Sequence, residues 1–198
     1  MPKSFSEWIN LLPSFGAILF TAVAVKWLDD FIDGESYTES FRAGAAYSLT
    51  AILLAAALEF SLTFALFAAC YIIGMFNSLK MRLPSGLPSW AESVIALILA
   101  IIFSGFKQVC WALLIIISVQ LIDDIMDYKL DQSQNRSNAV LYFGLERSWI
   151  LFLFCFYLSL KFQPLLSVIV LAAALITGNV LFSKAGGGRS LNATTRYD

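Results

Sequence analysis

The sequence predicts an all-α fold, a polytopic membrane helical bundle with about seven transmembrane helices. Three observations lead to this fold class. Hydrophobic residues make up 59% of the 198 residues, and the mean hydropathy is +0.77. Charged residues make up only 14% of the chain, whereas a soluble domain has roughly 25%. Seven apolar runs follow one another, most of them close to the roughly 17–25 residues that a spanning helix needs.

Short polar segments separate the runs, and we expect the shorter runs to continue as helix into their flanks. They cover residues 9–28, 43–58, 60–77, 89–106, 108–126, 147–161 and 164–183. The stretch 43–77 would measure about 50 Å as one helix at 1.5 Å per residue, which is too long for a single span. We divide it at Glu59, because a carboxylate is costly at the bilayer centre and tolerated at an edge.

The division at Glu59 also determines the predicted topology. With seven spans, the ends of the first, third, fifth and seventh helices share one side, where ten of the thirteen Lys and Arg residues lie. The positive-inside rule makes that side cytoplasmic, with the N-terminus opposite. We expect a single transmembrane domain over 1–185 and a flexible cytoplasmic tail over 186–198. The first apolar run lacks the basic region and cleavage site of a signal peptide, so we expect it to be retained.

The composition excludes several kinds of chemistry. The chain has no histidine, which rules out a Ser-His-Asp triad, a histidine general base and a His-ligated zinc site. A net charge of −1 gives no indication of nucleic-acid binding. The lipid bilayer is the expected partner, and nothing indicates an obligate protein partner. The three cysteines lie in apolar runs without a C-x-x-C pair, and we interpret them as small buried hydrophobes.

Seven of the fourteen acidic residues form two clusters at the ends of apolar runs. These candidate metal ligands are Asp29, Asp30, Asp33, Asp123, Asp124, Asp127 and Asp131. Residues three, four and seven apart share a helix face, so the last three form a stripe. Crowded carboxylates repel one another unless a cation neutralises them, and Mg²⁺ often joins one or two carboxylates to a substrate phosphate. A solvated helix end fits less well, because negative charge is unfavourable at a helix C-terminus. The candidate catalytic residues are Asp30, Asp33, Asp124 and Asp127.

Basic residues lie near the acidic clusters, where a diphosphate would need them. The candidates are Lys80, Arg82, Arg136 and Arg42. Arginine binds phosphate oxygens in a bidentate way and lysine offers a point charge. The positive-inside bias also explains any one of them, so both interpretations stay open, and for Arg42 the bias is the favoured explanation. Lys26, one turn before Asp29 and Asp30, is either their ion-pair partner or a snorkelling interfacial lysine. Tyr71 and Trp111 either line an apolar tunnel or belong to ordinary packing.

Three stretches resemble the UbiA superfamily of intramembrane prenyltransferases. Asp124-x-x-Asp127-x-x-x-Asp131, followed by Arg136-Ser137-Asn138-Ala139 and Phe143-Gly144, looks like the second aspartate motif and the Lys-Ser-Thr-Ala and Phe-Gly segments after it. Asp29-Asp30-x-x-Asp33 is similar to the first motif, Asn-Asp-x-x-Asp-x-x-x-Asp. The segment 71–84, with its Ser78-Leu79-Lys80-Met81-Arg82, resembles the basic loop between the motifs. The likeness covers roughly residues 20–185.

The chain also departs from the family pattern. The family usually has nine spans, Asp29 stands where the first motif has Asn, and Tyr37 occupies the position of its last acid. The resemblance implies a UbiA-like helical bundle around a central cavity, with Mg²⁺ held by both motifs and a prenyl diphosphate whose tail lies in an apolar tunnel. Basic side chains and metal would stabilise the departing diphosphate.

Three functions remain open on this basis. The first is a Mg²⁺-dependent prenyltransferase that passes the prenyl group to an acceptor, with an active-site mouth at the cytoplasmic surface. The second is a UbiA-type terpene cyclase, in which the allylic cation is captured within the same molecule. The third is a divalent-cation transporter or a non-catalytic lipid-binding protein. A transporter needs polar groups along a path to the far side, and the helix middles are almost free of charge, so it ranks last.

Overall fold

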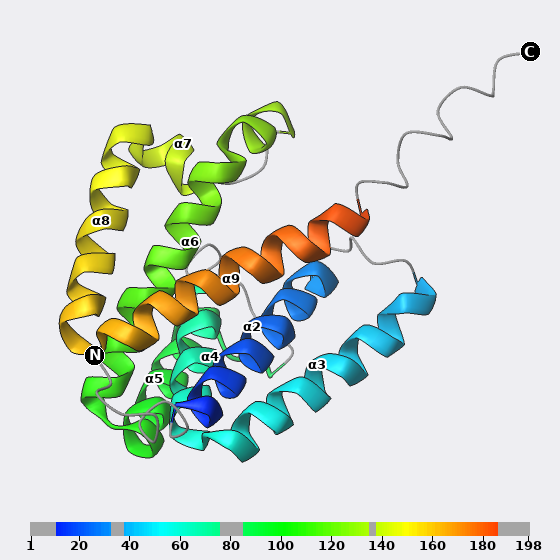
Figure 1. Cartoon of the computed structure of the whole chain (residues 1–198). Coiled ribbons are helices and arrows are strands. Elements are labelled where there is room, and N and C mark those ends of the chain that lie inside the picture. Colours follow the sequence, from blue (N-terminus) through cyan, green and yellow to red (C-terminus); the bar gives the residue numbers. More distant parts are fainter. Residues whose placement is uncertain (1–10, 33–37, 76–84, 135–137, 186–198) are drawn as a thin grey trace, which may run out of the picture.

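The computed structural model describes residues 11–32, 38–75, 85–134 and 138–185, and these residues form eight α-helices. The helices are α2 (Leu12–Ile32), α3 (Thr38–Leu58), α4 (Phe60–Met75), α5 (Ser89–Ser104), α6 (Phe106–Gln134), α7 (Ala139–Phe143), α8 (Leu145–Phe162) and α9 (Pro164–Ala185). The all-α prediction is confirmed for the described residues. The seven long helices coincide with the seven apolar runs, and α7 is a short additional helix after α6 (Figure 1).

Two of the helix breaks have clear local causes. Glu59 separates α3 from α4, as predicted, and its carboxylate accepts a hydrogen bond from the Ser14 hydroxyl at the start of α2. Gly105 separates α5 from α6 with a φ of 82°. That left-handed conformation is readily adopted by glycine and disfavoured for residues with a Cβ. Both breaks therefore lie where the sequence provides a polar or permissive residue.

Helix α6 extends well beyond its apolar run. The run stops at 126, but the helix continues to Gln134, so Asp123, Asp124, Asp127 and Asp131 lie within a helix of 29 residues, as their spacing predicts. At 1.5 Å per residue this helix is about 44 Å long, which exceeds the roughly 30 Å of a bilayer core. Hydropathy marks where apolar side chains end, whereas the backbone hydrogen-bond ladder continues through polar residues. Similarly, α2 continues to Ile32 and includes Asp29 and Asp30.

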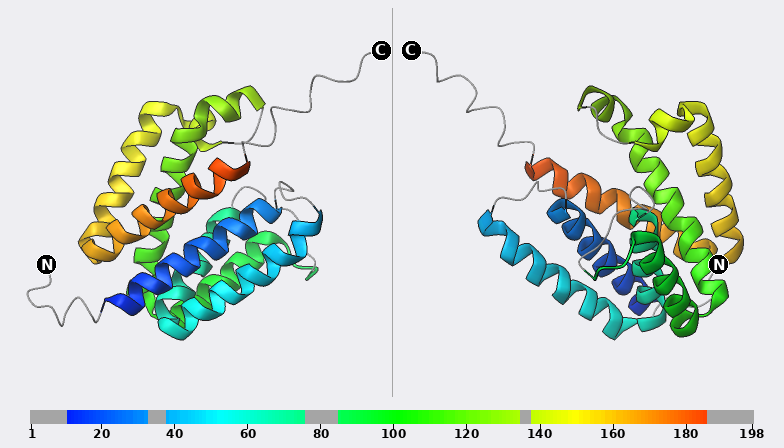
Figure 2. Two further views of the ribbon diagram at one scale, coloured as in Figure 1. Left: turned by 45° about the vertical axis from the view of Figure 1, so that its right-hand side comes forward. Right: turned by 180° about the vertical axis from the view of Figure 1, so that it is seen from behind.

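Four helices form a closed ring, which we call the four-helix ring. In it α2 packs against α4 and α9, and α6 packs against the same two helices. The acid-bearing helices α2 and α6 thus lie on opposite sides of the ring, with α4 and α9 as its walls. Helix α3 covers α2, α5 covers α4, and α8 covers α6 from outside (Figures 1 and 2).

Polar side chains tie the ring together at the N-terminal ends of its helices. The Trp111 indole on α6 donates to the Ser167 hydroxyl on α9 over 2.9 Å, in a fully buried site. The Gln163 amide, which precedes α9, donates to Gln108 at 2.6 Å. The fully buried Trp111–Ser167 bond is costly to break, so it stabilises the contact between α6 and α9 at this end of the ring.

The packing pattern places small residues inside and large apolar residues outside. The buried set contains many alanines together with serines and threonines such as Ser118, Ser148 and Ser159. Large apolar side chains face outward on α3, α5 and α8, with Ile102 67% and Ile150 68% exposed. Water-soluble monomers rarely expose such wide apolar faces, whereas membrane helices pack through small residues.

One described segment, Phe106–Lys129 of α6, is long and apolar enough to cross a membrane by length and composition. Five other apolar segments of the described helices are shorter, for example Leu12–Leu28 of α2 and Ser89–Ser104 of α5. The number of spans therefore stays a prediction. The proposed tail 186–198 lies outside the described residues.

Candidate functional site

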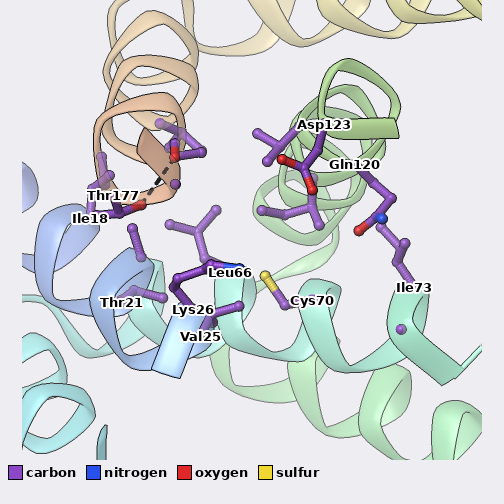
Figure 3. Close-up of a pocket in the computed structure, with 17 residues that line it drawn as sticks. Ile18, Thr21, Val25, Lys26, Leu66, Cys70, Ile73, Gln120, Asp123 and Thr177 are labelled. Carbon is purple, nitrogen blue, oxygen red and sulfur yellow. Dashed lines mark hydrogen bonds between the residues drawn. The ribbon is translucent and has the colours of Figure 1, made fainter. Parts of the chain in front are cut away.

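A cavity of about 200 Å³ lies inside the four-helix ring. Its lining comes from all four ring helices, over 18–26 of α2, 66–74 of α4, 116–123 of α6 and 170–178 of α9 (Figure 3). The cavity therefore begins in the middle of the ring and extends away from the hydrogen bonds at the N-terminal ends. The two helices that carry the acidic clusters, α2 and α6, line it from opposite sides of the ring.

The inner part of the cavity is apolar. We call its deepest residues, one from each ring helix, the floor: Ile18, Leu66, Ile116 and Val170. Two threonines also line it, but the Thr21 hydroxyl donates to the Ala17 carbonyl at 2.7 Å, and the Thr177 hydroxyl donates to that of Ala173 at 2.9 Å. Because their hydroxyl hydrogens are used within their own helices, these threonines leave the interior suited to hydrocarbon.

Charged and polar side chains line the opposite end of the cavity, which we call the mouth. Lys26 reaches it from α2, and Gln120 and Asp123 reach it from α6 (Figure 3). Gln120 and Asp123 are three residues apart and share one helix face. The mouth thus brings a lysine and a carboxylate from the two acid-bearing helices to one apolar cavity.

Asp124 lies beside Asp123 but contacts a different element. Its carboxylate accepts a hydrogen bond from the Ala139 amide at 3.0 Å, at the start of α7. Asn138, which is buried, donates to the Asp124 carbonyl at 2.8 Å and caps α7 through the Val140 amide. Asp124 therefore fastens the segment after the second acidic cluster to α6, and the cavity lining includes Asp123 instead.

The structure describes only some of the other predicted site residues. Asp127 is half-buried and lies four residues after Asp123, on the same face of α6. Asp29, Asp30, Asp131 and Arg42 lie within helices, and their side chains are outside the described part of the structure. Asp33, Lys80, Arg82 and Arg136 lie outside the described residues altogether. Their assignment to metal and diphosphate binding stays a prediction.

Two residues that line the mouth, Lys26 and Gln120, are not among the predicted site residues. The sequence does carry a signal for Gln120, because Gln120, Asp123 and Asp127 form a polar stripe that enters an apolar helix. Lys26 is expected as an ion-pair partner or a snorkelling residue, and its place in the cavity lining depends on the rotation of α2. Tyr71 and Trp111 are not in the lining. The Tyr71 hydroxyl donates to the Glu92 carboxylate of α5, and Trp111 is fully buried, as expected for side chains that pack between helices.

The described donors can supply part of a Mg²⁺ site. Magnesium is commonly held by one or two carboxylates, waters and substrate phosphates. Asp123 at the mouth and Asp127, one turn further along α6, offer two carboxylates on one helix face. Among the described residues no three acidic, histidine or cysteine side chains gather in one group, and the side chains of Asp29, Asp30 and Asp131 lie outside the described part of the structure.

Comparison with protein-family models, with curated proteins and with solved structures gave no match for this chain.

Proposed function

We propose that this chain is a Mg²⁺-dependent intramembrane prenyltransferase that acts on a prenyl diphosphate. The cavity carries the proposal, because it combines an apolar interior with a mouth lined by Lys26, Gln120 and Asp123. A prenyl diphosphate matches these two parts of the cavity, because it has an anionic head and a hydrocarbon tail. Hydrocarbon buried in the interior would contribute roughly 0.8 kcal/mol per methylene.

A membrane location supports the same proposal. The outward faces of α3, α5 and α8 carry large apolar side chains, and the inner contacts use alanine and serine. This distribution suits a bundle surrounded by lipid, since hydrocarbon solvates the outer face and small residues let helices approach closely. We propose seven spans, with the mouth and the C-terminus on the cytoplasmic side, as the distribution of Lys and Arg predicts.

Each part of the mouth has a role in the proposed reaction. Lys26 supplies a positive charge that binds the diphosphate oxygens. Asp123 and Asp127, with the acids of the first cluster, would hold Mg²⁺, which supplies charge neutralisation for the leaving group. The bond between the allylic carbon and the diphosphate oxygen breaks, and the diphosphate leaves with the electron pair. The acceptor then forms a bond to that carbon and loses a proton. The apolar wall excludes water from the cation until the acceptor reacts.

Diphosphate release tests this proposal directly. Protein purified in lipid nanodiscs would be incubated with Mg²⁺ and dimethylallyl, geranyl, farnesyl or geranylgeranyl diphosphate. We expect Mg²⁺-dependent release that falls about 10²–10³-fold in Asp123→Asn, the usual range for removing one stabilising group in an active site. Glu146→Gln is the matched control, because Glu146 is an exposed acid in the first turn of α8 and outside the cavity.

The products distinguish the proposed transferase from the cyclase. A prenylated acceptor supports the transferase, whereas a cyclic hydrocarbon or alcohol formed without an acceptor would replace it by the cyclase. Absence of release from every diphosphate, or full release in EDTA, would contradict both. Transport of Mg²⁺ or Mn²⁺ into vesicles without diphosphate release would favour the cation transporter.

A further inference from the structure

We propose that the cavity selects a ten-carbon prenyl chain, and that Leu66 and its neighbours in the floor set this limit. The inference deepens the proposed function and depends on it for the nature of the substrate. It follows from the depth of the cavity, its volume and the packing beneath its floor.

The depth can be read from the lining residues of each ring helix. On α2 the lining runs from Ile18 to Lys26, which is eight residues at 1.5 Å each, or about 12 Å. On α6 it runs from Ile116 to Asp123, or about 10 Å. An extended isoprene unit adds four carbon–carbon bonds of about 1.5 Å in a zigzag, which is roughly 5 Å. Two units therefore fill the distance from mouth to floor, and a third would need about 15 Å.

The volume gives the same chain length independently. A cavity of about 200 Å³ equals roughly seven waters at ~30 Å³ each. A hydrocarbon carbon with its hydrogens takes up somewhat less volume than a water, so this space holds roughly seven to ten carbons. A five-carbon chain would leave part of it empty, and a twenty-carbon chain would exceed it at least twofold.

The floor is firmly supported from below. Ile18 and Leu66 are each 2% exposed and belong to a core cluster with Trp111 and Ile115, which are fully buried. The Trp111 indole is held by Ser167, so this side chain cannot rotate away without losing a buried hydrogen bond. A longer chain therefore meets packed side chains where the second isoprene unit ends.

Binding of unreactive analogues tests the limit without requiring turnover. The probes are the S-thiolodiphosphates of dimethylallyl, geranyl, farnesyl and geranylgeranyl chains, titrated into the protein in nanodiscs by calorimetry. Each buried methylene is worth a factor of about four in affinity. We expect at least tenfold tighter binding of the geranyl than of the dimethylallyl analogue, no further gain for farnesyl, and at least tenfold weaker binding of geranylgeranyl than of geranyl.

Substitution of a floor residue should change the prenyl chain length that the cavity prefers. Leu66→Ala removes three carbons from the floor and should make the farnesyl analogue bind at least tenfold tighter than the geranyl one. Leu62→Ala is the matched control, since Leu62 lies one turn deeper on α4, is fully buried and is not in the lining. It should lose stability in the same way and keep the geranyl preference. If Leu66→Ala does not fold, Ile116→Phe raises the floor from a half-buried position and should shift the preference to dimethylallyl.

The outcomes separate this inference from the proposed function. Geranyl preference without diphosphate release from any substrate would support the chain-length limit and overturn the enzyme. Diphosphate release with geranylgeranyl bound as tightly as geranyl would support the enzyme and overturn the limit. An unchanged preference in both floor variants would also overturn it.

Discussion

Replacing Asp124 by alanine is predicted to lower the free energy of unfolding by about 1–2 kcal/mol, whereas Asp123→Ala should change it by about 0.5 kcal/mol or less. The difference comes from their surroundings. The Asp124 carboxylate accepts the Ala139 amide at 3.0 Å in a partly buried site, and Asp123 is exposed at the mouth of the cavity. Loss of the acceptor for an amide at a helix start typically costs this much, whereas substitution of an exposed surface residue usually costs about 0.5 kcal/mol or less.

Asparagine at position 124 separates the hydrogen bond from the charge. Asp124→Asn keeps a side-chain oxygen that can accept the Ala139 amide, so we expect most of the stability to return, with a residual loss of a few tenths of a kcal/mol. The effects of substitutions at positions 123 and 124 on diphosphate release should rank differently from their effects on stability. Asp123→Asn should abolish most diphosphate release with stability unchanged, because its carboxylate lines the proposed site.

Amide hydrogen exchange and thermal unfolding in nanodiscs would measure both effects. A loss of 1–2 kcal/mol corresponds to roughly 5–30-fold faster exchange at the Ala139 amide. In Asp124→Ala this increase should be confined to α7 and its junction with α6. Unchanged exchange at Ala139, or equal losses in the alanine and asparagine variants, would show that the hydrogen bond does not hold α7.

Three further predictions concern the core, the mouth and the metal. Ser167→Ala should lower the free energy of unfolding by about 1–3 kcal/mol in thermal unfolding, because the buried Trp111 N–H loses its acceptor. Ser159→Ala is the control and should lower it less, because it removes only a hydrogen bond within one helix. Gly178→Leu should weaken geranyl analogue binding at least tenfold in calorimetry, since Gly178 lines the cavity and has open space beside it, whereas Gly44→Leu on α3 should not. EDTA should stop diphosphate release and added Mg²⁺ should restore it, and release that persists in EDTA would exclude a metal role.

Features that depend on local composition were predictable from the sequence. The break at Glu59 follows from the cost of a carboxylate inside an apolar stretch, and the structure has it at that residue. The number and order of the long helices follow from the apolar runs in the same way. The end of α6 was not predictable from hydropathy, because leaving an apolar environment does not break the backbone hydrogen bonds that define a helix.

The face that each helix turns inward was harder to predict. Successive residues on a helix differ by about 100° in direction, so Asp123 and Asp124 face different neighbours. Which of them meets the cavity depends on how α6 packs against α4, α8 and α9, and these contacts are distant in sequence. The position of Lys26 in the cavity lining likewise depends on the rotation of α2. The place of the acids along each helix thus follows from the sequence, whereas packing determines that Asp123 lines the cavity.

The separation of the two acid-bearing helices is controlled by other parts of the chain. Helices α2 and α6 face each other across the cavity, and α4 and α9 act as spacers between them. Ala65 and Ala69 give α4 a narrow inner surface, so the spacer is thin. A bulkier residue at either position would widen the distance between α2 and α6 without altering any residue that lines the cavity. The width of the cavity is therefore controlled by residues that lie outside its lining.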